Sequence, residues 1–300
     1  MLGQVYKAHT DSYQVCVEGK LYNCKARGVL KVKGNGIAVG DFVNVENNTI
    51  ISVCERKNKF IRPNVANIDL VVAVVSPEPK PDFYLIDKLL LNCVKEGVDF
   101  AIVTNKSDIS YALFNEISKE YNDLGVDIIS VCAKTNEGVK ELKSKLNGKL
   151  CVLAGQSAVG KTSIINAMFD LNLKTGDLSE KISRGKHTTT RSEIFEYGDI
   201  KIIDSPGFAV IDAMVELDEL PNCYPEYLQV ANECKFRGCS HISEPECRVK
   251  QLVELGVLSK TRYERYKEIY NEISKRRIIY EKNRLYRCRK YGISIIAGCR

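Results

Sequence analysis

No run of apolar residues in this 300-residue sequence is long enough to span a membrane as a helix. The N-terminus, Met1-Leu2-Gly3-Gln4, lacks the basic and apolar regions of a signal peptide. Both absences predict a cytoplasmic protein with no membrane partner. Twelve cysteines in such a protein indicate free thiols and a metal site, not disulfides.

The net charge of +6 hides a segregation along the chain. Residues 1–66 carry ten Lys and Arg against five Asp and Glu, and residues 248–300 carry fifteen against five. The middle, residues 67–247, carries nineteen against twenty-eight. Charge runs usually form solvated surfaces, but two basic segments in one chain favour a large polyanion as partner, with nucleic acid ahead of membrane.

Residues 1–66 are predicted to form a small β domain. Residues 14–18 and 43–46 alternate between apolar and polar side chains, with Gly- and Asn-rich turns between such segments. This pattern is typical of a barrel of about five strands, such as the oligonucleotide-binding (OB) fold. The barrel is either purely structural or carries a binding face on one hairpin, whose basic residues are Lys25, Arg27, Lys31 and Lys33. Residues 62–66 are predicted to be a linker.

A glycine-rich stretch in the middle of the chain predicts a phosphate-binding loop, where the alternative is a plain turn between strand and helix. It follows an apolar run, residues 150–154, and precedes a segment with helical spacing, residues 163–169. Glycines let backbone N–H groups surround phosphate oxygens, and the helix N-terminus adds partial positive charge. Lys161 is predicted to reach the β- and γ-phosphates, and the Thr162 hydroxyl to bind Mg²⁺. The predicted nucleotide-binding residues are Gly155, Gln156, Ser157, Ala158, Val159, Gly160, Lys161, Thr162 and Ser163.

Two motifs upstream of this loop predict that the nucleotide base is guanine. Asn105, Lys106 and Asp108 form the N-K-x-D pattern after a predicted buried strand, residues 100–104. A carboxylate at Asp108 accepts from guanine N1–H and N2–H₂, a pair of donors that adenine lacks. The second motif follows another strand, residues 127–131, and resembles the S-A-K element, in which a backbone N–H reads guanine O6; its residues are Cys132, Ala133 and Lys134.

Two segments downstream are predicted to be switches that respond to the γ-phosphate. Residues 174–192 form a long polar stretch in which Thr188 or Thr189 is expected to bind Mg²⁺. The second segment is D-x-P-G, in which Asp204 holds Mg²⁺ through water and the Gly207 N–H contacts the γ-phosphate. The next residue is Phe208, which cannot orient the attacking water as a glutamine would. His187 is a candidate for that catalytic role, and a merely solvated histidine is the alternative.

These motifs occur in an unusual order, because the two guanine motifs precede the phosphate loop. Residues 67–221 are therefore predicted to be an α/β, circularly permuted P-loop GTPase domain. Permutation is tolerable because all these loops are expected at one edge of the sheet. It also makes the D-x-P-G switch lead directly into the C-terminal domain.

The C-terminal domain, residues 222–300, is predicted to be helical and to bind one structural Zn²⁺. The pattern C-x₄-C-x-H-x₅-C suits a closed tetrahedral site, with the ligands Cys234, Cys239, His241 and Cys247. Buried free cysteines are the alternative interpretation, and Cys223 is a competing ligand that we do not favour. The sequence assigns no role to Cys288 or Cys299 in the C-terminal tail.

Two helices are predicted to follow the zinc ligands. The first starts at Pro245 and reaches Leu255, and a longer one is capped by Ser259. A stripe that includes Tyr263 and Tyr266 is expected to pack on the zinc-binding residues. Beyond it, residues 275–291 combine many basic residues with tyrosines, which are the ingredients of RNA binding.

The ensemble of motifs resembles the bacterial ribosome small-subunit-dependent GTPase A family, the RsgA type of circularly permuted GTPase. The resemblance covers essentially the whole chain and includes the R-G-x-H-T-T element around His187. It implies a monomeric maturation factor that binds GTP, GDP and the small ribosomal subunit with its rRNA, and whose GTP hydrolysis the subunit stimulates. It also implies that His187 helps to position the attacking water. Ala158, Thr162 and Cys132 depart from residues that are frequent in the family, without removing a required group.

Two other functions remain open at this point. One is an RNA-binding checkpoint protein that uses GTP only as a conformational ligand, which Phe208 favours and a functional His187 opposes. The other is a P-loop kinase or ATPase, which the two guanine motifs oppose.

Overall fold

The computed structural model places most of the chain in two compact units, Met1–Asp212 and Ala213–Arg300. It describes residues 1–9, 11–28, 30, 36–171, 173, 192–209 and 211–291; the side chains of residues 206, 209, 279 and 281–291 are not described. Each unit is considered separately below. The domain boundaries predicted from the sequence, 1–66, 67–221 and 222–300, remain predictions.

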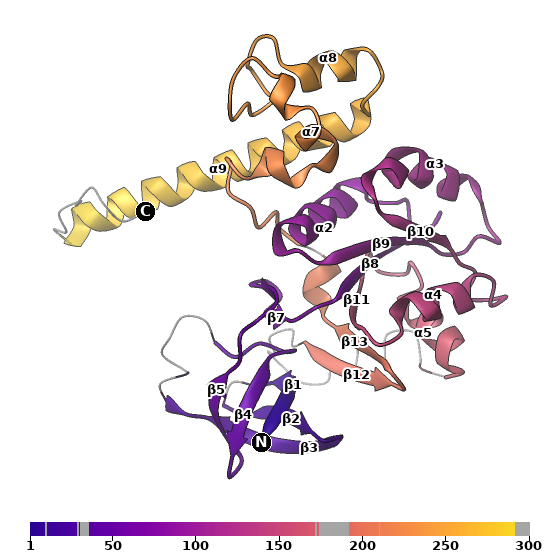
Figure 1. The fold of residues 1–300 in the computed structure, drawn as a ribbon, viewed down its shortest axis with the longest axis vertical. Coiled ribbons are helices and arrows are strands. Elements are labelled where there is room, and N and C mark those ends of the chain that lie inside the picture. The colour runs from indigo at the N-terminus through magenta and orange to yellow at the C-terminus, as the bar shows by residue number, and fades with distance from the viewer. Residues whose placement is uncertain are drawn as a thin grey trace. The chain divides into compact units, whose positions relative to one another are not determined.

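The first unit begins with a closed five-stranded barrel, as the alternating pattern predicts (Figure 1). Strand β1 pairs with both β2 and β4, β2 with β3, β3 with β5, and β5 with β4, which closes the ring. Inward-facing valines such as Val5, Val15 and Val43 are fully buried in its core. The strands are β1 (Leu2–Ala8), β2 (Tyr13–Val17), β3 (Lys20–Ala26), β4 (Phe42–Glu46) and β5 (Thr49–Val53).

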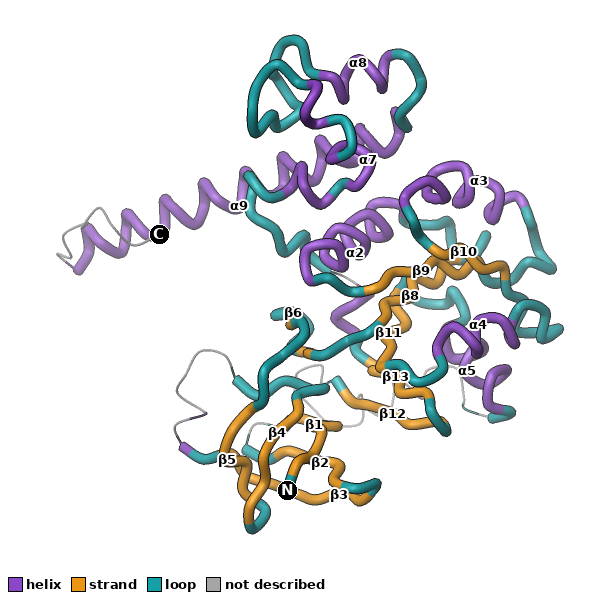
Figure 2. The backbone as a smooth tube through the Cα atoms, viewed as in Figure 1, coloured by secondary structure: helices purple, strands orange, loops and turns teal. Residues whose placement is uncertain are grey.

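The rest of this unit is a mostly parallel sheet in the order β10-β9-β8-β11-β13-β12, with only β12 antiparallel. Its central strands are apolar throughout because helices cover both faces (Figure 2). The strands are β8 (Leu70–Val75), β9 (Asp99–Thr104), β10 (Asp127–Ser130), β11 (Leu150–Ala154), β12 (Glu193–Tyr197) and β13 (Ile200–Asp204).

Four helices supply the two outer layers of this sheet. Helices α2 (Phe83–Glu96) and α3 (Ala112–Tyr121) belong to one apolar cluster, and α4 (Val139–Leu146) and α5 (Lys161–Phe169) to the other. Alternate residues of β8 feed these clusters, with Val71 in the first and Val72 in the second. The doubly wound architecture is confirmed, although α5 begins at Lys161, two residues before the predicted start.

The barrel and the parallel sheet share one strand pairing, between β1 and β12. Lys7 lies opposite Glu193, and its Nζ donates to the Glu193 carboxylate at 2.6 Å. Nearby, the Tyr6 hydroxyl donates to Glu196 at 2.7 Å. These contacts hold the barrel to β12, which pairs with β13, the strand that ends in the D-x-P-G segment.

The predicted linker at residues 62–66 is wrong, because these residues form half of an ordered two-stranded ribbon. Strand β6 (Lys59–Phe60) pairs with β7 (Val65–Ala66), and Val65 and Ala66 are fully buried. The Ala66 N–H donates to the Val39 carbonyl at 2.9 Å, which fixes the ribbon to the barrel. Val65 and Ala66 pair with β6, and the local sequence does not reveal this pairing.

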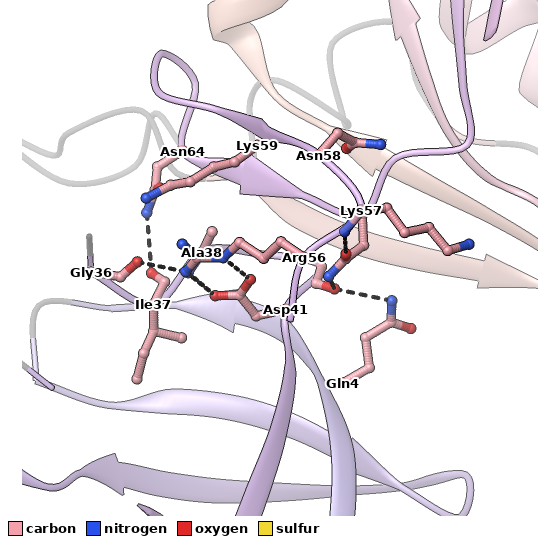
Figure 3. A network of polar contacts seen from close by, with 12 residues as sticks. Gln4, Gly36, Ile37, Ala38, Asp41, Arg56, Lys57, Asn58, Lys59 and Asn64 are labelled. Atoms are coloured by element: carbon pink, nitrogen blue, oxygen red, sulfur yellow. Dashed lines mark hydrogen bonds and ion pairs between the residues drawn. The ribbon is translucent and has the colours of Figure 1, made fainter. Parts of the chain in front are cut away.

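A buried ion pair holds the barrel loop beside this ribbon (Figure 3). Asp41 is fully buried and accepts from Arg56 Nε at 2.6 Å and Nη2 at 2.7 Å. It also accepts from the Ala38 N–H at 2.7 Å. This carboxylate raises the pKa of Arg56, so the guanidinium is firmly charged.

The second unit packs short helices on a long one. Helix α8 (Arg248–Glu254) begins three residues after Pro245, so the predicted proline start is wrong, whereas the stop at Gly256, which has φ +73°, is confirmed. The Ser259 hydroxyl accepts from the Arg262 N–H, as predicted for the cap of α9 (Lys260–Tyr291). Another short helix, α7 (Pro225–Leu228), precedes the predicted zinc ligands in the chain.

The described residues include no helix with both the length and the apolar character that crossing a membrane requires.

We predict that Asp41→Ala lowers the free energy of unfolding by about 3 kcal/mol, because it leaves the Arg56 guanidinium unpaired in a largely buried position. Chemical denaturation of the two proteins would measure the difference. Lys145→Met is the control, since it removes the exposed pair with Asp127 and should cost under about 1 kcal/mol. Equal effects of the two substitutions would contradict the assignment.

Candidate functional site

The predicted phosphate loop connects β11 to α5 and needs glycine at two positions. Gly155 has φ +136°, and a Cβ there would lie 2.2 Å from the Val74 carbonyl oxygen. Gly160 has φ +95°, and a Cβ there would lie 2.3 Å from Asn105 Nδ2. Ala158 takes a left-handed φ of +64° at the exposed tip, where its Cβ is tolerated. The loop therefore keeps its backbone open toward the start of α5.

The Lys161 side chain folds back on this loop. Its Nζ donates to the carbonyls of Gly155 and Gln156, each at 2.8 Å. Burial lowers its pKa, while the charge of Asp204 works in the opposite direction. Burial also raises the pKa of Asp204, to about 6, although the Lys161 charge opposes that rise. The ammonium is thus held where phosphate oxygens can replace two carbonyls.

Asn105 joins the three loops that the sequence motifs predict. Its Nδ2 donates to the Val159 carbonyl at 2.9 Å, and its Oδ1 accepts from the Ala133 N–H at 3.2 Å. The side chain is buried, with 3% of the residue exposed. Lys106 adds a second connection, because its Nζ donates to the Ala158 carbonyl at 2.9 Å. The N-K-x-D loop, the Cys132 loop and the phosphate loop therefore meet at one edge of the sheet.

Asp108 faces this junction and keeps part of its carboxylate open to solvent. The Cys132 thiol donates to Oδ1 at 3.4 Å, and Lys134 Nζ lies 3.7 Å from Oδ2. One third of the Asp108 side chain is exposed. A thiol at position 132 thus does the same orienting work as a serine hydroxyl would, and the carboxylate remains free to accept from a base.

The structure adds a loop for which the sequence predicted no role. Residues 76–82 follow β8 and lie against the phosphate loop: the Asp82 N–H donates to Gln156 Oε1 at 3.2 Å, and Lys106 Nζ donates to the Glu78 carbonyl. Asp82 also caps α2 by accepting from the Leu85 N–H at 3.0 Å. The available signal was position, since this loop leaves a parallel strand at its carboxyl end.

The D-x-P-G segment begins where β13 ends. Asp204 is half-buried at the end of the strand, and Ser205 is bonded to Ser192 through their hydroxyls at 2.8 Å. Phe208 is 1% exposed and packs edge-to-face on Phe60, with ring centroids 5.5 Å apart. The Phe208 side chain is therefore part of the hydrophobic core. His187, Thr188 and Thr189 lie outside the described residues, so their predicted roles stay predictions.

The second unit brings all four predicted zinc ligands together. The ligand atoms of Cys234, Cys239, His241 and Cys247 lie within 4.8 Å of one another, and Cys223 is not among them. His241 Nδ1 lies 3.3 Å from the Cys247 sulfur and 3.7 Å from that of Cys234. Zn–S and Zn–N bonds of about 2.3 and 2.0 Å place tetrahedral ligand atoms about 3.5–3.8 Å apart. The set therefore fits a closed zinc site coordinated through Nδ1.

Hydrogen bonds hold the loop between these ligands. Glu244 accepts from the Ser240 N–H and hydroxyl at 2.7 and 2.6 Å, and from the Ile242 N–H at 3.1 Å. Burial raises the Glu244 pKa, but together these donors outweigh it and hold the pKa at about 2. From α9, the Tyr263 hydroxyl donates to the His241 carbonyl at 2.7 Å, and Tyr266 to that of Ser240. The predicted packing of the tyrosine stripe on the zinc-binding residues is confirmed.

We predict that Asp108→Asn weakens GTP binding at least about a hundredfold, because an amide N–H donor, in place of a carboxylate acceptor, would face the N1–H of guanine. The same amide offers a donor to the C2 oxygen of xanthine, so XTP affinity should rise. Equilibrium titration with both nucleotides tests this. Asp123→Asn, on an exposed turn, is the matched control, and unchanged nucleotide preference in Asp108→Asn would contradict the assignment.

For the second unit, we expect one zinc per purified chain by elemental analysis. Cys239→Ser should retain less than about a fifth of it and lower the unfolding temperature, because metal binding and folding are coupled. Cys54→Ser, outside the cluster, should change neither quantity. Full zinc content in Cys239→Ser would exclude Cys239 as a ligand.

Comparison with known proteins agrees with the predicted GTPase domain and with the N-terminal barrel. The sequence models of the RsgA GTPase and of the RsgA N-terminal domain match residues 53–214 and 2–50. Two relatives named small ribosomal subunit biogenesis GTPase RsgA come from Geobacillus sp. strain WCH70 and Agathobacter rectalis. They are 38% and 37% identical, and the matches cover 93% and 92% of this chain and 99% of each relative.

Solved structures extend the match to three dimensions. YjeQ from Thermotoga maritima superposes with a TM-score of 0.75 at 33% identity, covering 91% of this chain and 98% of that one. YloQ, described as a circularly permuted GTPase, gives 0.71 at 29% identity, covering 92% and 95%. Both the barrel region and the GTPase region thus match the RsgA family, and one solved relative is described as circularly permuted. The chain belongs to the RsgA family of circularly permuted GTPases, and it is a GTP hydrolase.

Proposed function

We propose that this GTPase binds the small ribosomal subunit and hydrolyses GTP during late maturation of that subunit, which in turn stimulates hydrolysis. The observation that carries the proposal is near-full-length similarity to relatives named for small-subunit biogenesis. The charge pattern supports it, because a chain with two basic ends suits a large RNA surface. Lys275, Arg276 and Arg277 are exposed on α9, as such contact requires.

In this proposal the loops at the edge of the parallel sheet bind both the guanine base and the phosphates of GTP. Asp108 accepts from the guanine donors, and the Ala133 N–H turns from Asn105 to guanine O6. Lys161 leaves the two loop carbonyls for the β- and γ-phosphates, and Gly207 presents its N–H to the γ-phosphate. The remaining phosphate-loop residues supply N–H groups and shape, and the Lys106 stem lies against the base.

Mg²⁺ is implied by the reaction, and the residues present fit it. The Thr162 hydroxyl at the start of α5 and the half-buried Asp204 carboxylate at the end of β13 are oxygen ligands of the kind that Mg²⁺ takes. Either Thr188 or Thr189 would complete the set. When bound, the ion neutralises charge on the β- and γ-phosphates.

The hydrolytic water needs a group other than residue 208, because Phe208 is buried against Phe60. We assign its positioning to His187, and we infer that subunit stimulation acts through this residue. The Zn²⁺ of the second unit has a structural role. The protein acts in the cytoplasm as a monomer, without a membrane.

The second candidate function, a checkpoint protein that binds GTP with negligible turnover, rests on the same Phe208. It differs in one measurable respect, since small subunits would leave the single-turnover rate unchanged. Stimulation of the rate by subunits separates the two.

We predict that His187→Ala lowers the subunit-stimulated rate about a hundredfold, the usual contribution of a positioned acid–base or water-orienting group. GTP affinity should stay nearly intact, since the base and phosphates keep their partners. His9→Ala, in the barrel, is the matched control. Single-turnover hydrolysis with saturating subunits measures the effect, and a wild-type rate in His187→Ala would remove this residue from the mechanism.

A further inference from the structure

The ribbon β6–β7, residues 59–66, has two different faces. Its inner side is apolar and lies on the D-x-P-G segment: Phe60, 3% exposed, contacts Phe208, and Pro63 contacts Gly207. Its turn carries Ile61, 63% exposed, and the exposed Arg62. One short segment therefore connects solvent directly to a nucleotide switch.

The inner contact is close enough to set the position of Gly207. A Cβ on Gly207 would lie 3.0 to 3.3 Å from three carbons of the Pro63 ring. The glycine backbone thus rests close against the ring, and a side chain there would press on Pro63. Because the same backbone carries the N–H expected at the γ-phosphate, a displacement of Pro63 changes where that N–H lies.

The base of the ribbon is pinned on both sides. The Ala66 N–H donates to the Val39 carbonyl at 2.9 Å, which ties β7 to the barrel. On the other side, the Lys59 N–H donates to Glu96 of α2 at 3.1 Å. Within the turn, Asn64 Nδ2 donates to the Ile37 carbonyl at 3.1 Å (Figure 3), whereas the neighbouring Ile61 and Arg62 are exposed to solvent.

The exposed side of this region is basic. Lys57, whose side chain is 71% exposed, extends away from the Arg56–Asp41 pair in Figure 3, and its Nζ forms an exposed ion pair with Asp69 at 3.2 Å. Arg62 lies at the turn, and Lys59 is half-buried; burial and the Arg56 charge lower the Lys59 pKa. Three cations and an exposed isoleucine in six residues suit a phosphodiester backbone, which offers negative oxygens and sugar edges.

We propose that the exposed turn of the β6–β7 ribbon, with Lys57 and Arg62, binds the RNA of the small subunit and transmits this contact to Gly207 and Phe208. The proposal rests on the proposed function, which supplies the RNA partner and the stimulated rate. It assigns the ribbon as a sensor: Lys57 and Arg62 make contact, and Phe60 and Pro63 position the switch.

Three proteins test the proposal by GTP hydrolysis with and without small subunits. Lys57→Glu/Arg62→Glu reverses two exposed charges and should lower the subunit-stimulated rate about tenfold, with the unstimulated rate and GTP affinity unchanged. Lys119→Glu/Lys140→Glu makes the same charge change on the exposed surfaces of α3 and α4 and should behave as wild type. Equal losses in both double variants, or no loss in the first, would overturn the contact.

Phe60→Leu tests transmission separately from contact. It keeps the core apolar and the turn intact, so it should bind subunits as tightly as wild type but show several-fold less stimulation. Normal stimulation together with normal binding would overturn the positioning role of Phe60. A wild-type protein that subunits do not stimulate at all would instead contradict the proposed function, so the two failures are distinguishable.

A photo-crosslinking benzophenone side chain at position 61 identifies the class of partner. We expect crosslinks to ribosomal RNA when the labelled protein is bound to small subunits. Crosslinks confined to ribosomal proteins would overturn RNA as the occupant of this turn.

Discussion

Asn105 makes the interaction on which the nucleotide site depends. Its amide spans the Val159 carbonyl and the Ala133 N–H, so one buried side chain joins the base-reading loops to the phosphate loop. These loops lie far apart in sequence, at residues 105, 133 and 159, so a tertiary contact has to hold them together. A buried amide with both ends hydrogen-bonded fixes their relative position.

Permutation also determines which segments adjoin the switches. The chain reaches the parallel sheet through the β6–β7 ribbon, and it leaves through the D-x-P-G segment, where Phe60 meets Phe208. The barrel pairs with β12 through Lys7 and Glu193, directly opposite Asp204 across the next strand. The barrel and its ribbon thus contact the switch region at two places. A displacement of either one would therefore change the position of switch residues.

The sequence predicted well what depends on local pattern. The glycines of the phosphate loop, the strands that precede the nucleotide motifs and the zinc ligand set follow from periodicity and spacing, and the structure has them. It predicted poorly what depends on distant partners. Residues 62–66 read as a linker because nothing local shows that Val65 pairs with Phe60 and that Ala66 bonds to Val39. The loop at Glu78 and Asp82 was missed for the same reason, since its role comes from Lys106 and Gln156.

Phe208 limits what the D-x-P-G segment can contribute to hydrolysis. A side chain buried on Phe60 cannot leave the core to orient water without losing roughly 2 kcal/mol of apolar burial. The site therefore binds and aligns the nucleotide with its own loops but leaves the water unpositioned. In the proposed function His187 positions this water, and the contact of Pro63 with Gly207 gives the β6–β7 ribbon access to the switch. The packing of the core sets this division of roles, because the phenylalanine that is buried on Phe60 occupies the position of the usual catalytic side chain.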